Sequence, residues 1–410
     1  MSKVAVVGSC GRTGFRFSLV ASNKGHHVVG IDLDEEKIYE IKQGNLPFTE
    51  KDAEIYLEQA LKKKSLTVTS DYKPIEKAEI VVIAVSTPVD SNLNPGLEPV
   101  AGVVLDIAPY LKENQLIIFR SILSPVVIER IKTLIEDKTG FKIGKNLYLA
   151  FAPEVNDENS NIHSLANSPQ PVGAYDEESH VAAEDFFKTI TKGKITWLTP
   201  SEAMLSKLMK NMHSYIQSAI ANEFYLLAEE HKANIHKIFN SLQWKSHYPN
   251  PNSSGPGTHK EGWFLVDQIP FGDLITTAFK INESIPALIV QKLQNYKINK
   301  VAILGMSNWA DSDYYRSSLS YKLRKLLYYK NYTVGCYDPY LPEYADSSAI
   351  HKSDVVILMT PHKEFEDLNR IKELVKNPNC IYIDLKGFWK ETLEKGVNGI
   401  WQGKEGKVKK

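Results

Sequence analysis

The sequence predicts an α/β protein with two doubly wound, Rossmann-like domains joined by one long central helix. Two sets of short apolar runs rich in Val and Ile, separated by helix-length segments, are typical of parallel sheets buried on both faces. Between them, apolar residues recur at helical spacing over residues 201–231 without Gly or Pro, which predicts a single helix. We therefore expect a first domain over residues 1–197, a central helical segment over 198–297 and a second α/β domain over 298–410.

The runs expected to form strands fall into two groups. The first sheet should contain residues 4–7, 28–31, 80–85, 116–119 and 147–151. The second should contain residues 300–304, 333–337, 355–359 and 380–384. A stretch rich in Pro and Gly over residues 247–262 is expected to be a loop, and loops of that length are often functional.

Composition excludes several classes of function. Lys plus Arg and Asp plus Glu are equal at 49 each, so no net field attracts nucleic acid or an anionic membrane. The three cysteines are an odd number without metal-type spacing, which argues against disulfides and a metal site and favours a cytoplasmic location. The longest apolar runs have the length of strands, and the first strand begins too early to leave room for a secretion signal.

A glycine-rich turn follows the first predicted strand and precedes a helical segment. This arrangement places the pyrophosphate of a dinucleotide on a helix N-terminus. The turn contains Gly8, Gly11, Arg12, Thr13 and Gly14. The first glycine stands one residue earlier than in the usual Gly-x-Gly-x-x-Gly pattern.

An acidic residue after the second strand supports a dinucleotide site. Asp32 lies eighteen residues beyond Gly14, where a carboxylate can accept hydrogen bonds from both ribose hydroxyls. A 2′-phosphate would be repelled, so NAD is favoured over NADP. Ser86, Thr87 and Pro88 end the third predicted strand, at the edge where ligands of such sheets bind, although an ordinary turn would look the same.

Two further pairs of polar residues are candidates for catalysis. Glu154 and Glu158 follow the fifth predicted strand, and one of them could act as a general base. Lys207 and Asn211 lie four residues apart on the long helix, so both could stabilise a developing oxyanion. Taken alone, each pair is more often a solvated loop or helix surface.

Together these residues resemble the UDP-glucose/GDP-mannose dehydrogenase family. The family's Pro-Glu-x-x-x-Glu element is matched at Pro153, Glu154 and Glu158. Its helix with Lys-x-x-x-Asn, followed by Asn-Glu, is matched at Lys207, Asn211, Asn222 and Glu223. Its nucleotide-sugar-binding half is similar to the segment around Gly305, Asp313, Arg316, Ser318 and Asp338. The resemblance covers nearly the whole chain and implies an NAD-dependent enzyme, with Ser121 among the residues at the cofactor.

The departures from the family pattern are concentrated in a few places. The loop that resembles Gly-Pro-Gly-x-Gly-Gly-x-Cys carries Gly262 where the family has its nucleophilic cysteine. Ile122 replaces a threonine, the lysine of the Gly-Leu-x-x-Lys element is missing, and Asp-x-Arg becomes Asp384-Leu385-Lys386. The resemblance implies that the substrate is bound by Gly255, Gly257, Arg316 and Lys386, and His259, in the same loop, is a further candidate as a base or sugar ligand.

We therefore expect NAD-dependent oxidation of a nucleotide sugar, with a UDP-sugar favoured. Because a glycine cannot attack an aldehyde, a single two-electron step is favoured over the family's four-electron route. A uronic acid formed without cysteine and a catalytically silent binding protein are alternatives. A β-hydroxyacid dehydrogenase is a further alternative, against which the second α/β domain argues. The long helix has more apolar positions than one side of a lone helix needs, which predicts a homodimer.

Overall fold

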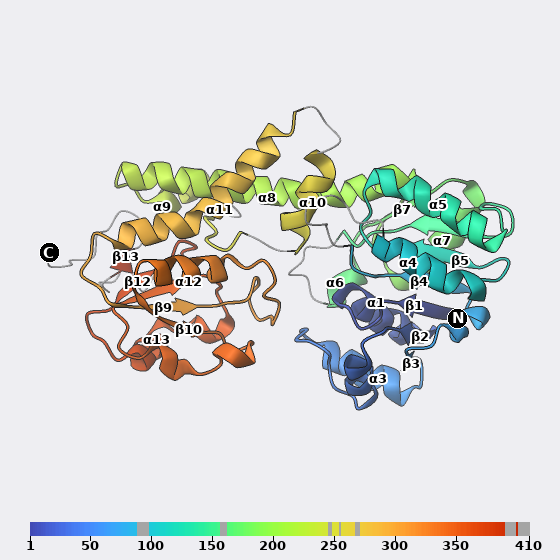
Figure 1. Cartoon of the computed structure of the whole chain (residues 1–410), viewed down its shortest axis with the longest axis horizontal. Helices are drawn as coiled ribbons and strands as arrows, with labels where there is room; N and C mark the ends of the chain where they lie inside the picture. The colour runs from blue at the N-terminus through green and yellow to red at the C-terminus, as the bar shows by residue number, and fades with distance from the viewer. Residues whose placement is uncertain are drawn as a thin grey trace. The chain divides into compact units, whose positions relative to one another are not determined.

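A computed structural model describes residues 1–87, 98–155, 162–244, 248–253, 256–266, 271–389 and 399–400, without the side chains of 256–260 and 399–400. The chain forms two compact units (Figure 1). The first unit comprises Met1–Asn211 and Trp263–Gln268, and the second comprises Met212–Gly262 and Ile269–Lys410. Each unit contains its own sheet and its own hydrophobic core.

The first unit is built on an eight-stranded sheet in the order β3-β2-β1-β4-β5-β6-β7-β8. Its strands are β1 (Lys3–Val7), β2 (His27–Ile31), β3 (Leu66–Thr69), β4 (Ile80–Ile83), β5 (Leu116–Phe119), β6 (Tyr148–Phe151), β7 (Gln170–Ala174) and β8 (Ile195–Leu198). Only the pairing of β6 with β7 is antiparallel. The strand order reverses between β1 and β4, and ligands of such sheets bind beyond the carboxyl ends of the strands at this point.

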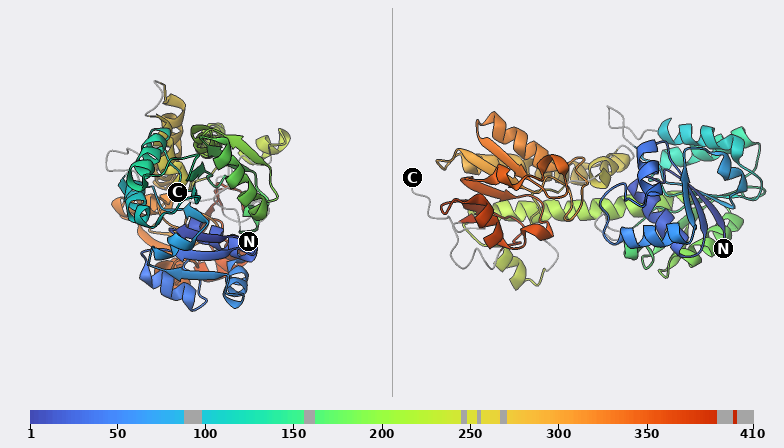
Figure 2. Two further views of the ribbon diagram at one scale, coloured as in Figure 1. Left: turned by 90° about the vertical axis from the view of Figure 1, so that its right-hand side faces the viewer. Right: turned by 90° about the horizontal axis from the view of Figure 1, so that it is seen from below.

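Both faces of this sheet are buried, as a doubly wound fold requires. Val4 and Val6 of β1 pack in one cluster with residues of α1, α3 and α7, whereas Ala5 and Val7 pack in another with residues of α4 and α5. Figure 2 shows helices on both sides of the strands. The helices of this unit are α1 (Arg12–Asn23), α2 (Glu35–Lys42), α3 (Ala53–Lys62), α4 (Glu98–Ile107), α5 (Pro125–Thr139), α6 (Ile162–Leu165) and α7 (Glu177–Ile190).

The second unit contains a five-stranded, all-parallel sheet in the order β10-β9-β11-β12-β13. Its strands are β9 (Lys300–Leu304), β10 (Thr333–Tyr337), β11 (Val355–Leu358), β12 (Ile381–Ile383) and β13 (Gly399–Ile400). Val301 and Ile303 pack with residues of α11 and α12, and Ala302 and Leu304 pack with residues of α13. Its helices include α9 (Ile235–Ser241), α11 (Asp273–Leu293), α12 (Leu319–Tyr329) and α13 (Leu368–Val375). The predicted α/β class is confirmed.

The predicted long helix is α8, which spans Pro200–Glu230 and has 31 residues without interruption. Its first residue is a proline, which lacks the N–H that the first turn of a helix could not pair. Residues of this helix belong to both units. The three apolar residues Met204, Leu208 and Met212 are buried, while Met209 is 58% exposed.

The structure differs from the predicted elements at one loop and at the strands β3, β7, β8 and β13, which were not predicted. The expected loop over residues 247–262 ends early, because Pro256 begins helix α10 (Pro256–Val266). Strands β3 and β8 have no uninterrupted apolar run, since threonines alternate with apolar residues in β3 and β8 is only partly buried. Among the described residues, no helix is long and apolar enough to cross a membrane.

Candidate active site

The glycine turn between β1 and α1 can only be built with glycines at two of its positions. Gly8 has a φ of 82°, and a Cβ on it would lie 2.8 Å from the carbonyl oxygen of Ala84. A Cβ on Gly14 would lie 2.2 Å from the carbonyl oxygen of Gly8. The N–H of Gly11 closes the turn by donating to the Gly8 carbonyl at 3.2 Å. The turn therefore keeps side chains away from the N-terminus of α1, as a bound pyrophosphate requires.

Asp32 stands directly after β2 and faces this turn. Its Oδ2 accepts the backbone N–H of Cys10 at 2.7 Å, and its Oδ1 accepts the N–H of Asp34 at 3.2 Å. A carboxylate has about four acceptor positions, so these two bonds leave capacity for ribose hydroxyls. The predicted cradle and its acidic residue are thus brought together, and they fit a dinucleotide without a 2′-phosphate.

The ends of β4 and β5 are joined beside the turn. Ser121 is buried and its hydroxyl donates to the carbonyl of Val85 at 2.7 Å. Thr87 is buried, Ser86 is exposed, and Pro88 lies outside the described residues. The polar residues predicted at this edge therefore stand at the carboxyl ends of neighbouring strands, although Ser121 uses its hydroxyl to fix the backbone.

Glu154 lies in a cluster of charged side chains in the first unit. Its Oε1 is 3.8 Å from Nη1 of Arg16, and its Oε2 is 3.8 Å from Nη2 of Arg120. Nη2 of Arg16 also pairs with Oε2 of Glu50 at 2.8 Å. The Glu50 side chain is only 4% exposed, and burial raises its pKa while Arg16 acts against that rise. Glu158 lies outside the described residues.

Arg120 fixes the turn on which Glu154 stands. Its Nη1 donates to the carbonyl of Ala152 at 3.2 Å and to Oε1 of Gln170 at 3.1 Å. Gln170 in turn donates to the carbonyl of Pro153 at 3.2 Å. Burial lowers the pKa of Arg120, and the nearby Glu154 counteracts this shift. A buried guanidinium needs such partners, because an unpaired buried charge is costly.

The two donors predicted on α8 belong to the same unit as Glu154. Lys207 and Asn211 are 5% and 8% exposed, so neither is the wet helix surface that the sequence left open. The neighbouring Lys210 donates to the carbonyl of Val155 at 2.6 Å, which ties α8 to the turn after β6. An amine and an amide held in a buried place can stabilise negative charge on a reacting oxygen.

Gly262 is buried within α10 and closely surrounded. A Cβ on it would lie 2.7 Å from Cε2 of Phe279, 3.0 Å from Sδ of Met212 and 3.2 Å from Cγ2 of Ile275. All four residues belong to the second unit. Apolar side chains therefore occupy the space into which a residue at this position would project.

A hollow of about 460 Å³ in the second unit contains one predicted substrate ligand, Lys386. It is lined by Ser218, Tyr248, Asn250, Pro361, Lys386, Gly387 and Phe388. Burial lowers the pKa of Lys386 to about 8, although the nearby Asp384 opposes this. The Asp384 carboxylate accepts the N–H groups of Gly387 and Trp389 at 2.9 and 2.7 Å, which holds the loop that carries Lys386.

The wall of this hollow is positioned by two asparagines. Asn222 of α8 is fully buried, accepts the N–H of Asn250 at 2.8 Å and donates to its carbonyl at 3.2 Å. Asn252 donates to the carbonyl of Ser307 at 2.9 Å and accepts the N–H of Leu319 at 2.8 Å. These bonds hold the segment before α10 against other parts of the second unit.

Of the remaining predicted substrate ligands, only Arg316 has a described side chain. Arg316 is exposed and does not line this hollow. Gly257 and His259 lie in α10, but their side-chain positions are outside what the structure describes, as is all of Gly255.

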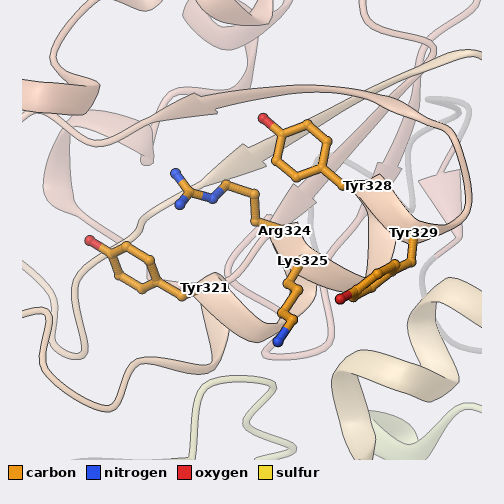
Figure 3. Close-up of a pocket in the computed structure, with 5 residues that line it drawn as sticks. All are labelled: Tyr321, Arg324, Lys325, Tyr328 and Tyr329. Atoms are coloured by element: carbon orange, nitrogen blue, oxygen red, sulfur yellow. The ribbon is translucent and has the colours of Figure 1, made fainter.

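A second hollow of about 410 Å³ lies along α12 and contains no predicted site residue (Figure 3). It is lined by Tyr321, Arg324, Lys325, Tyr328 and Tyr329. The Arg324 guanidinium donates a hydrogen bond to the hydroxyl of Tyr344. In the described part of the chain, no group of three or more His, Cys, Asp or Glu residues is placed to hold a metal.

Sequence reasoning missed Arg16, Glu50 and Arg120. Each is a charged residue, for which a solvated side chain is the ordinary expectation. Arg120 had the strongest signal, because it directly follows the apolar run of β5 at the ligand edge of the sheet. Glu50 carried no local signal, since its burial depends on a residue of α1 far away in the sequence.

Comparisons with known proteins agree with this geometry. Residues 2–191 match the UDP-glucose/GDP-mannose dehydrogenase family, NAD binding domain, and residues 302–391 match its UDP binding domain. Among curated relatives, a UDP-N-acetyl-D-mannosamine dehydrogenase of Methanocaldococcus jannaschii is 29% identical, over 95% of this chain and 93% of the relative.

Two solved structures have a similar fold. A UDP-D-ManNAc dehydrogenase from Pyrococcus horikoshii has a TM-score of 0.85 at 25% identity, covering 94% of this chain and 96% of that one. A UDP-glucose dehydrogenase from Pyrobaculum islandicum has a TM-score of 0.84 at 19% identity and covers 94% of each chain. With both family domains present in order, the chain belongs to the UDP-glucose/GDP-mannose dehydrogenase family and is an NAD-dependent dehydrogenase of nucleotide sugars.

Proposed function

We propose that this enzyme oxidises a UDP-sugar in a single two-electron step and releases a carbonyl product. The observation that carries the proposal is the packing around Gly262. An added Cβ would already lie 2.7 Å from a ring carbon of Phe279, so a cysteine there would require the ring to move. Without a thiol there is no thioester, and the second oxidation of the family's route loses its covalent intermediate.

The three cysteines of the chain do not supply a substitute. Burial is the main cause that raises the pKa of Cys10 to about 12, of Cys336 to about 11 and of Cys380 to about 12. A thiol must lose its proton to act as a nucleophile, and these pKa values keep all three protonated near neutral pH. Buried thiols of this kind are structural.

The residues for a first oxidation are retained. NAD, when bound, would accept the hydride from the carbon that bears the reacting hydroxyl group. The proton of the substrate hydroxyl passes to the carboxylate of Glu158 or Glu154, directly or through water. Lys207 and Asn211 hold the same oxygen while negative charge develops on it, a role that their burial strengthens because water competes less.

We assign the nucleotide to the hollow around Lys386. The amine can pair with a diphosphate, and Tyr248 and Phe388 offer aromatic faces for a base. A UDP-sugar is favoured because the second family model describes a UDP binding domain. Among UDP-sugars, those with an N-acetylated hexosamine are favoured by the relatives named as UDP-N-acetyl-D-mannosamine dehydrogenases.

The assignment is tested by following NADH absorbance with UDP-N-acetyl-D-mannosamine, UDP-glucose and GDP-mannose. We expect turnover with the first sugar above the other two. Lys207→Met should lower that turnover by about ten- to a thousandfold if the amine stabilises the oxyanion. Lys188→Met is a matched control, because Lys188 lies in an exposed ion pair with Glu184 in the same unit. NADH formation with none of the sugars would contradict the proposal.

We also propose that two copies associate through α8. Four apolar side chains of this helix stay exposed in the single chain: Met209, Ile220, Phe224 and Leu227 are 58%, 41%, 37% and 59% exposed. Contact with a second copy would bury these side chains, and burial of apolar surface stabilises an interface by about 25 cal/mol per Å².

A further inference from the structure

We infer that Arg16 is a positioning residue for Glu154 and that Glu50 positions Arg16. This rests on the proposed function in one respect, namely that Glu154 acts in the reaction. Arg16 lies on α1, one turn beyond Arg12, at the helix whose N-terminus forms the cofactor cradle. Nothing in the family pattern or in the sequence marked this residue.

The Glu154 carboxylate forms an ion pair with a different guanidinium at each of its oxygens. Oε1 faces Nη1 of Arg16 and Oε2 faces Nη2 of Arg120, each at 3.8 Å. Arg120 is anchored to the carbonyl of Ala152 and to Gln170, so its position depends on β5 and β7. One guanidinium on each oxygen favours one plane of the carboxylate, and loss of Arg16 would remove the charge that attracts Oε1.

Glu50 determines where Arg16 lies. Its carboxylate is 4% exposed and holds Nη2 of Arg16 at 2.8 Å, well within the distance of a charge-assisted hydrogen bond. Arg12 is a second cation near Glu50, with its Nη1 4.0 Å from Oε2, and it also donates to the carbonyl of Thr49 at 3.2 Å. With Nη2 held in this way, Nη1 is directed at Glu154.

Arg16 is more than a counter-ion for Glu50. A buried Glu50 would be neutralised equally well by a guanidinium that pointed only at it. Instead Arg16 bridges two carboxylates that are 104 positions apart in the sequence, on a helix whose first turn belongs to the cofactor cradle. One side chain thereby links the orientation of Glu154 to the cofactor helix.

The test is a double-mutant cycle on kcat, measured with NAD and the accepted UDP-sugar. It compares Arg16→Met/Glu50→Gln in the native background and in a Glu154→Gln background. The paired substitution avoids leaving the buried Glu50 charge without its closer partner, and thermal unfolding checks that each variant folds. If Arg16 acts through Glu154, the pair should lower kcat by about tenfold or more in the native background, because misplaced reacting groups are costly. In the Glu154→Gln background it should change kcat by less than about twofold.

Other outcomes would overturn either the role of Arg16 or the role of Glu154. Equal factors in both backgrounds would mean that Arg16 does not act through Glu154. No loss in the native background would mean that Arg16 does not position anything the reaction needs. If Glu154→Gln alone keeps full kcat, the role of Glu154 in the proposed function fails. If Glu154→Gln lowers kcat but Arg16→Met/Glu50→Gln does not, only the positioning role of Arg16 is refuted. Arg16→Lys, which keeps the charge but not the fork of two Nη groups, should restore kcat only in part.

Discussion

Replacing Gly262 by alanine tests how tightly its surroundings are packed. The new Cβ would meet Cε2 of Phe279 at 2.7 Å, whereas carbon atoms normally pack at about 3.5–4.0 Å. Contacts of 3.0 Å to Met212 and 3.2 Å to Ile275 limit how far the backbone can retreat. Overpacking of this kind costs about 1–3 kcal/mol. Alanine is more favourable than glycine in a helix by about 1 kcal/mol, so we expect the free energy of unfolding to fall by about 0–2 kcal/mol.

Gly102 provides the matched control. It lies inside α4, and a Cβ on it would meet nothing within 4 Å. Gly102→Ala should therefore stabilise its unit by about 0.5–1 kcal/mol through helix propensity alone. Urea unfolding, with the transition of each unit followed separately, measures both effects. Gly262→Cys should lower the free energy of unfolding more than Gly262→Ala does. Equal stabilisation by Gly262→Ala and Gly102→Ala would refute the argument that position 262 has no room for a side chain.

Three other results are expected. NAD should bind at least tenfold more tightly than NADP, a difference of about 1.4 kcal/mol or more, and Asp32→Ala should narrow the gap; equal affinities of the native protein in fluorescence titrations would contradict this. Lys386 is charged below its pKa of about 8, so calorimetric affinity for UDP should fall as pH rises through 8, by up to about tenfold per pH unit, and Lys386→Arg should abolish the fall because arginine stays charged. Light scattering at micromolar concentration should give a dimer, and Leu227→Glu should shift it toward monomer; a monomeric native protein would refute association through α8.

The fold was predictable because its signals are local. Strands buried on both faces, such as β5 and β9, are uninterrupted apolar runs, and their bounds match the predicted ones residue for residue. Helix α8 has apolar spacing and no internal breaker. Strand β3 was missed because threonine alternates with apolar residues in it, so only its pairing with β2 identifies it as a strand.

Positions of the candidate cofactor site could be predicted where the backbone requires one residue type. Gly8 and Gly14 are required by contacts of 2.8 and 2.2 Å that any side chain would make, and Asp32 follows from its place after β2. The charged cluster around Glu154 was not predictable, because a sequence does not show which distant charges meet. Arg16 looks like an ordinary polar position of α1 until Glu50 and Glu154 are placed beside it.

We expect the oxidation to stop after one hydride transfer. The most direct test runs the reaction to completion with limiting UDP-sugar, counts the NADH formed per sugar consumed, and only then reduces the product with borodeuteride. A single hydride transfer gives one NADH per sugar and a deuterium-labelled alcohol, which reports an aldehyde or ketone. Two NADH per sugar with a carboxylate product would contradict this expectation, because water or another side chain would then perform the work of the missing thiol at Gly262.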